Sequence, residues 1–240
     1  TEATRLIAEN ILSQGVIYAE IRFAPQKHTL QGLSQEDAIK AVLKGIEKTK
    51  LKANLILCCM RGEGNEIVND KAQTLAEANE ETLRLTKKYL VEDGGVVAMD
   101  LAGAEGLYPT ENFRDLFLKA KAMGIPFTIH AGESDGADSV RAAIEFGARR
   151  IGHGVRSCED PEVVKLLKEE GIFLEICPSS NLLTCVVKDL SEHPFMDYFK
   201  QGLRVTINTD DMGIEGTTLA KEFQYVKEPF NLTPEEEKVV

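Results

Sequence analysis

Five polar residues of the kinds that bind metals and move protons stand just after short apolar segments of the chain. They are His130, Glu133, His153, Asp210 and Asp211. Imidazole nitrogen and carboxylate oxygen suit Zn²⁺, and a catalytic zinc keeps one coordination position for water. A bound zinc lowers the pKa of that water to about 7, and a separate acid such as Glu133, which lies close after His130, can then transfer protons. These residue types therefore predict metal-assisted hydrolysis.

Apolar segments of strand length alternate with amphipathic helical segments along the chain. The expected strands cover residues 15–23, 55–60, 96–101, 125–129, 150–151, 172–176 and 203–207. The expected helices cover residues 34–48, 69–89, 110–123, 139–146, 160–170, 193–201 and 217–226, and another helix is expected to open at Thr233. Such alternation implies a parallel sheet covered by helices. Because the strands are nearly all apolar, we expect them to be buried on both faces.

The positions of the polar residues favour a closed barrel over an open sheet. Gly103 follows the third expected strand, and Ser179, Ser180 and Asn181 follow the sixth. In a barrel the carboxyl ends of all strands converge on one mouth. An open sheet could not bring residues from so many consecutive strands to one crevice. The sequence thus predicts an α/β fold of the TIM-type barrel class, as a single domain over residues 1–240.

Composition argues against several classes of protein. The chain has 240 residues, of which 43% are hydrophobic and 28% are charged, as in ordinary soluble globular proteins. No apolar run approaches the ~18 residues of a membrane helix, and the first ten residues lack the apolar core of a signal peptide. The net charge of −11, without a Lys/Arg cluster beyond Arg149–Arg150, argues against nucleic-acid binding. Five cysteines, none in a C-x-x-C pair, indicate reduced thiols and a cytoplasmic location.

Several short motifs resemble those of the adenosine deaminase family, in the order that the family has. They are EIRFAP at 20–25, DLAGAE at 100–105, TIHAGE at 128–133, RIGHGV at 150–155, CPSSN at 177–181 and NTDD at 208–211. The resemblance covers essentially the whole chain, and the H-A-G-E, H-G-V and T-D-D elements together are specific for this family. It implies a (β/α) barrel that hydrolyses adenosine and 2′-deoxyadenosine to inosine and ammonia with zinc, in purine salvage.

The resemblance also implies a role for individual residues around the metal. His130 and Asp210 resemble two zinc ligands. Glu133 resembles the acid that protonates purine N1 while C6 is attacked. His153 resembles the residue that orients and stabilises the attacking hydroxide.

Two further residues resemble contacts to the substrate, which is expected to be a small purine nucleoside. Asp211 resembles the contact to purine N7, and the backbone N–H of Gly103 resembles a donor to N3. Deamination of adenine or of a modified adenine is a close alternative. Related adenine deaminases tend to have R-I-D-H-G and C-P-L-S-N, whereas Gly152 and Ser179 in this chain favour the nucleoside.

The chain also departs from the family pattern. Family members open with a strand that carries His-x-His, which supplies two further zinc ligands, and no His-x-His occurs here. We therefore expect a chain cut at both ends that holds seven of eight strands, binds zinc weakly and has little activity alone. Its bare strand edges would favour self-association. A non-catalytic barrel fragment is the alternative from another class.

Simpler interpretations exist for several of these residues. Glu133 could cap the helix that follows it, and Asp210–Asp211 could cap the next one. The segment Ser179–Asn181 could be only a structural turn. His28 and His193 have no evident partners nearby in the sequence, and we expect both to be exposed to solvent.

Overall fold

The computed structural model describes residues 1–68 and 71–239, which fall into two compact units. Unit 1 comprises residues 1–108 and 113–128, and unit 2 comprises residues 109–112 and 129–240. Each unit combines a parallel sheet with helices, so the predicted α/β class is confirmed. The single domain remains a prediction. No helix in the described ranges has the length and apolar character that crossing a bilayer requires.

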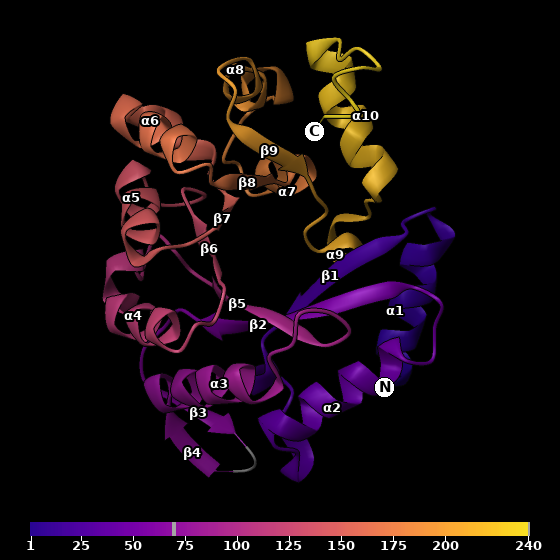
Figure 1. The fold of residues 1–240 in the computed structure, drawn as a ribbon, viewed down its shortest axis with the longest axis vertical. Coiled ribbons are helices and arrows are strands. Elements are labelled where there is room, and N and C mark those ends of the chain that lie inside the picture. Colours follow the sequence, from indigo (N-terminus) through magenta and orange to yellow (C-terminus); the bar gives the residue numbers. More distant parts are fainter. Residues whose placement is uncertain (69–70, 240) are drawn as a thin grey trace. The chain divides into compact units, whose positions relative to one another are not determined.

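Unit 1 is built on a parallel sheet with the strand order β1-β2-β5 (Figure 1). Its strands are β1 (Tyr18–Phe23), β2 (Lys52–Met60) and β5 (Val96–Ala102). Its helices are α1 (Glu2–Ser13), α2 (Gln35–Ile46), α3 (Leu75–Tyr89) and α4 (Arg114–Ala122). The core joins Ile39 of α2 and Leu85 of α3 to Leu55 and Leu57 of β2 and Val96 of β5, all fully buried. Packing of α2 and α3 on the sheet therefore holds this unit together.

A capping box starts α2 where the sequence predicted a helix. The Ser34 hydroxyl accepts a hydrogen bond from the backbone N–H of Asp37 at 3.1 Å. In return the Asp37 carboxylate accepts the backbone N–H of Ser34 at 3.1 Å. Two backbone donors that a helix start leaves unpaired are thereby satisfied.

The helix predicted over residues 69–89 is wrong in its first part. Thr74 caps α3 together with Glu77, so the helix begins only at Leu75. Before it, an antiparallel pair of strands is present, β3 (Asn65–Val68) and β4 (Lys71–Thr74). Residues 69–70 of the predicted helix lie outside the described residues. The capping box of Thr74 and Glu77 marks the start of this helix more accurately than the spacing of its apolar residues.

Unit 2 contains a second sheet with the strand order β6-β7-β8-β9. Its strands are β6 (Thr128–Ala131), β7 (Arg150–His153), β8 (Phe173–Ile176) and β9 (Arg204–Ile207). Parallel pairing sets Ile151 opposite Leu174 and Leu174 opposite Val205. The helices are α5 (Ala137–Phe146), α6 (Pro161–Glu169), α7 (Pro178–Leu183), α8 (Phe195–Lys200), α9 (Met212–Glu215) and α10 (Leu219–Phe230). Figure 1 shows α5, α6 and α8 along the outer side of these strands. Short 3₁₀ turns in the two units cover residues 25–27, 30–32, 110–113, 155–159 and 190–192.

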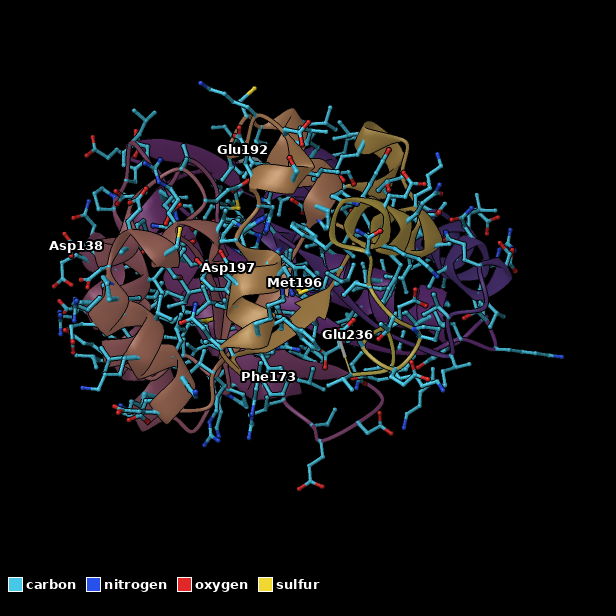
Figure 2. All side chains as sticks on the ribbon, turned by 90° about the horizontal axis from the view of Figure 1, so that it is seen from above. Asp138, Phe173, Glu192, Met196, Asp197 and Glu236 are labelled. Carbon is cyan, nitrogen blue, oxygen red and sulfur yellow. The ribbon has the colours of Figure 1, made fainter. Side chains whose placement is uncertain are left out.

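The helices of unit 2 are amphipathic, as the spacing of their apolar residues predicted. On α8 the side chain of Met196 is buried while that of its neighbour Asp197 is exposed, and Asp138 of α5 also faces solvent (Figure 2). Asp160 caps α6, because its carboxylate accepts the N–H of Glu162 at 2.9 Å. Gly147 ends α5 in the left-handed conformation, with φ at 103°.

Other expected boundaries need correction. The first strand begins at Tyr18, where residue 15 was expected. Tyr18 is exposed and the other residues of the strand are half-buried, so the expectation that both faces are covered is wrong for this strand. His130 and His153 lie inside the ends of β6 and β7, whereas the sequence placed them after the strands. The helix expected to open at Thr233 is a series of turns over residues 234–239. The short helix α7 was not expected at all.

A buried carboxylate ties α10 to the start of α7. Glu222 is fully buried, and its carboxylate accepts the backbone N–H of Ser179 at 2.9 Å. It also accepts hydrogen bonds from the hydroxyls of Ser179 and Thr217. A buried carboxylate is tolerated when donors surround it in this way. Glu222 thus fixes the first turn of α7, which carries Ser180 and Asn181.

We expect Glu222→Ala to lower the free energy of unfolding by about 2–4 kcal/mol, because three donors lose their buried acceptor. Denaturant unfolding monitored by circular dichroism measures this. The matched control is Glu228→Ala on the same helix, where the carboxylate is exposed; it should change the stability by less than about 0.5 kcal/mol. Equal losses in the two variants would contradict a clamping role for Glu222.

Candidate active site

The close approach of β6 and β7 brings two histidine rings together. A Cβ atom on Gly152 would lie 3.1 Å from Cα of His130 and 3.2 Å from its Cγ, so glycine lets the His130 ring lie against β7 without a shift of either strand. The ring centroids of His130 and His153 are 5.2 Å apart at an angle of 58°. The packing of these two strands therefore positions both imidazoles.

A glycine turn after β6 leads the chain into Glu133. Gly132 has a φ of 70°, and a Cβ there would lie 2.6 Å from Cγ2 of Val140. Both the conformation and the space at this position demand glycine. The Thr184 hydroxyl donates to the Glu133 carboxylate at 3.4 Å. The interpretation of Glu133 as a helix cap is wrong, because Gly136 is the N-cap of α5 and no side chain caps it.

His153 is a buried residue in a strained backbone conformation. Its φ is 62°, in the left-handed region that residues other than glycine rarely adopt, and it is 2% exposed. Such a conformation costs about 1–3 kcal/mol and persists only where the surroundings enforce it. Nε2 of His153 lies 3.6 Å from Oε2 of Glu133 and 3.8 Å from Oδ2 of Asp210. These separations exceed hydrogen-bond distances, but they place both carboxylates beside the same edge of the imidazole.

The two aspartates after β9 have different surroundings. The Ser180 hydroxyl donates to Oδ2 of Asp210 at 2.9 Å. Asp211 occupies the N-cap position of α9, but its side chain makes no capping hydrogen bond. Burial raises the pKa of Asp211, and the negative charge of Asp210 adds to this while His130 opposes it. Burial likewise raises the pKa of Glu215, followed by the charges of Asp210 and Glu222. The carboxylates at this end of unit 2 therefore repel one another.

The donor set of this site suits zinc in chemical type but not in number. His130 offers an imidazole and Asp210 a carboxylate, both common zinc ligands. Over the described ranges, no three His, Cys, Asp or Glu side chains come together as a metal-binding group. Catalytic zinc sites use three protein ligands. Within these ranges His130 and Asp210 are therefore two donors of a type that zinc accepts, fewer than a catalytic zinc site uses.

The remaining predicted residue, Gly103, belongs to unit 1. It follows β5 with a φ of 109°, and a Cβ on it would lie 3.3 Å from Cβ and from the backbone nitrogen of Arg61. Glycine is required there by the close approach of the two backbones. The residues that the structure brings together in unit 2 are His130, Glu133, His153 and Asp210, with Asp211 adjoining them in the chain.

Two residues of unit 2 contact this group although the sequence assigned neither of them a role. Asn181, whose segment could have been only a structural turn, is fully buried. Its Nδ2 lies 3.1 Å from Nδ1 of His153. The expectation that His193 is exposed is wrong, because it is 4% exposed and its Nε2 lies 3.2 Å from Oδ1 of Asn181. The only sequence signal for the burial of His193 was its position directly before Pro194 and the apolar first residues of α8. His28 is exposed as expected.

Burial keeps His193 neutral. Burial, with a smaller contribution in the same direction from the nearby His153, lowers the pKa of this imidazole to about 4. The folded-state pKa therefore lies below the usual value of 6.5. Between these values the unfolded chain binds the proton more readily than the folded chain does, so stability is lost as the pH falls through this window.

Replacing His193 by glutamine should remove this acid sensitivity. We expect the stability of the wild type relative to His193→Gln to fall by on the order of 3 kcal/mol between pH 7 and pH 4, from the size of the pKa shift. Urea unfolding at a series of pH values measures it. The control is the exposed His28→Gln, which should follow the wild type. A difference between wild type and His193→Gln that does not change with pH would contradict the buried neutral histidine.

Sequence comparisons with known proteins point to one family. A family model described as adenosine deaminase matches residues 2–239. The adenosine deaminase of Haemophilus ducreyi is 45% identical over 97% of this chain and 66% of its own length. That of Enterococcus faecalis is 39% identical over 99% of this chain and 69% of its own length. The chain therefore spans about two thirds of the length of these curated relatives.

Solved structures of deaminases share the fold. An adenine deaminase from Arthrobacter aurescens matches 98% of this chain and 70% of its own, with a TM-score of 0.82 and 27% identity. An N6-mAMP deaminase from Arabidopsis matches 97% of this chain and 68% of its own, with a TM-score of 0.83 and 26% identity. These matches confirm the predicted TIM-type fold class. With the family model covering nearly every residue and relatives of up to 45% identity, this chain belongs to the adenosine deaminase family.

Proposed function

We propose that this chain carries catalytic residues of a zinc-dependent hydrolase that converts adenosine and 2′-deoxyadenosine to inosine or deoxyinosine and ammonia. The observation that carries the proposal is the position of His153. Its Nε2 faces the carboxylates of Glu133 and Asp210 at 3.6 and 3.8 Å, beside the ring of His130. Family membership supports a hydrolytic deaminase, and the geometry supports these side chains as its reactive groups.

In this proposal each residue has one role in the reaction. His130 and Asp210 would hold the zinc, which would lower the pKa of a bound water to about 7. The water oxygen would form a bond to purine C6 while one water proton is passed on toward N1. The second water proton would go to the amino nitrogen as its bond to C6 breaks, so that ammonia leaves and the C6 carbonyl of inosine forms. Glu133 delivers a proton to purine N1 during the attack. His153 orients the attacking oxygen.

The proposal assigns substrate recognition to Asp211 and Gly103. Asp211 is placed at purine N7, and the backbone N–H of Gly103 donates to N3. Relatives of 37–45% identity are named adenosine deaminases, whereas the matching adenine and N6-mAMP deaminase structures are 26–27% identical to this chain. This difference favours the nucleoside over adenine or a modified adenine. A role in cytoplasmic purine salvage completes the proposal and agrees with the five cysteines, all in the described ranges, forming no disulfide there.

A non-catalytic barrel protein is the second candidate, and the incomplete zinc donor set favours it. The acid at position 133 and the strained His153 argue for chemistry, since stability alone does not explain a left-handed histidine. Activity of the full-length gene product separates the two candidates. Self-association through strand edges would be measured by the solution mass of the 240-residue chain.

Glu133→Gln in the full-length gene product should lower kcat for adenosine by about 10²–10⁴ while leaving the zinc content unchanged. Glutamine keeps the shape of the side chain but cannot deliver the proton. Inosine formation and metal content are measured on the same preparation, and Glu145→Gln on the exposed face of α5 is the control. Loss of zinc in the Glu133 variant, or more than a tenth of the activity retained, would overturn its role as the acid.

The 240-residue chain should bind zinc weakly, because His130 and Asp210 are too few donors for a tight site. Asp210→Ala should weaken this binding by about tenfold or more, whereas Asp211→Ala should leave it nearly unchanged. Competition with a chelator measures the affinity of all three proteins. The roles of the neighbours are reversed if the Asp211 variant loses zinc and the Asp210 variant keeps it. A tight, stoichiometric site in the chain alone would contradict the ligand count.

A further inference from the structure

A buried chain of hydrogen bonds in unit 2 leads from the backbone of α8 to His153. The backbone N–H of Phe195 donates to Nδ1 of His193 at 3.0 Å. Nε2 of His193 lies 3.2 Å from Oδ1 of Asn181. Nδ2 of Asn181 lies 3.1 Å from Nδ1 of His153. All three side chains are 4% exposed or less, so water does not compete for these contacts.

The backbone end of this chain sets the direction of every bond in it. An amide N–H can only donate, so Nδ1 of His193 accepts and the neutral ring carries its proton on Nε2. That proton goes to Oδ1 of Asn181, which leaves the NH₂ group of Asn181 facing His153. Because NH₂ donates, Nδ1 of His153 accepts. A neutral His153 then holds its proton on Nε2.

The other edge of His153 fits this tautomer. Its Nε2 faces carboxylate oxygens of Glu133 and Asp210 at 3.6 and 3.8 Å, and negative charge favours an N–H on that side. The first hydrogen bond of the series, from Phe195 to His193, persists near neutral pH, because burial keeps the pKa of His193 at about 4 and the ring stays neutral. A proton on Nδ1 of His193 would oppose the N–H of Phe195.

We propose that Asn181 and His193 are positioning residues that hold His153 as the tautomer with its proton on Nε2. This inference rests on the proposed function for its consequence. With a proton on Nε2, His153 donates a hydrogen bond to the attacking oxygen and has no lone pair there to remove a proton. His153 is then an orienting donor, and proton transfer falls to the carboxylate of Glu133.

The test records which ring nitrogen of His153 carries the proton, using two-bond ¹H–¹⁵N correlation spectra of protein labelled at histidine. His153→Gln identifies the signals. The wild type should show the proton on Nε2. Asn181→Asp replaces the NH₂ donor by an acceptor of the same size, so Nδ1 of His153 should then carry a proton. A wild-type proton on Nδ1, or an unchanged His153 signal in Asn181→Asp, would overturn the proposal.

Two variants at His193 separate positioning from simple packing. His193→Gln can accept from Phe195 and donate to Asn181, so it should keep the wild-type tautomer. His193→Leu fills a similar volume without polar atoms, so it should give a mixture of tautomers. If both variants give the same spectrum, the hydrogen bonds through His193 and Asn181 do not set the tautomer of His153, and the proposal fails. These spectra are independent of catalysis and are informative even if the protein does not deaminate adenosine.

Activity of the full-length gene product supplies the functional arm. Asn181→Asp should lower kcat by about 10²–10⁴ with KM changed only a few-fold, as when a triad histidine is held in the wrong tautomer. His193→Gln should retain at least ten times the kcat of Asn181→Asp. A reversed tautomer with unchanged kcat would overturn the catalytic consequence. An inactive wild type would instead contradict the proposed function and leave the spectra to decide the positioning role.

Discussion

The contact between β6 and β7 at Gly152 is the constraint on which the site in unit 2 depends. Without a Cβ at that position the ring of His130 lies against the neighbouring strand, and the next residue, His153, takes up its left-handed conformation beside it. The turn at Gly132 then brings the Glu133 carboxylate to within 3.6 Å of Nε2 of His153. The relative positions of the three side chains are therefore set by backbone packing before any side chain interacts with another.

This arrangement is costly, and buried polar contacts around it offset the cost. His153 is strained, and Asn181, His193 and Glu222 are polar residues with almost no exposure. Each has hydrogen-bond partners within unit 2, which is the condition under which buried polar groups are tolerated. These hydrogen bonds join α7 to α10 through Glu222, and α7 to the segment before α8 through His193.

Features encoded by neighbouring residues could be predicted from the sequence, and features that depend on tertiary packing could not. Ser34 with Asp37, Asp160 before Pro161 and Gly147 after α5 each carry their signal within a few residues, and the structure has the predicted helix ends there. The polar residues at strand ends were also predictable, because parallel strands place them at one edge. The hairpin of β3 and β4 was missed, since its short strands lack apolar alternation.

The pairing of Asn181 with His193 shows the same limit within the site. The two residues are separated by a loop, and only the docking of α8 brings them together. The direction of the hydrogen bonds between them is set by the backbone N–H of Phe195, which does not depend on any side chain. Every amino acid except proline would supply the same donor there. In evolutionary terms, the direction of the network is anchored at a position that nearly all mutations leave intact, so only its side-chain members, Asn181 and His193, are open to mutations that reverse it.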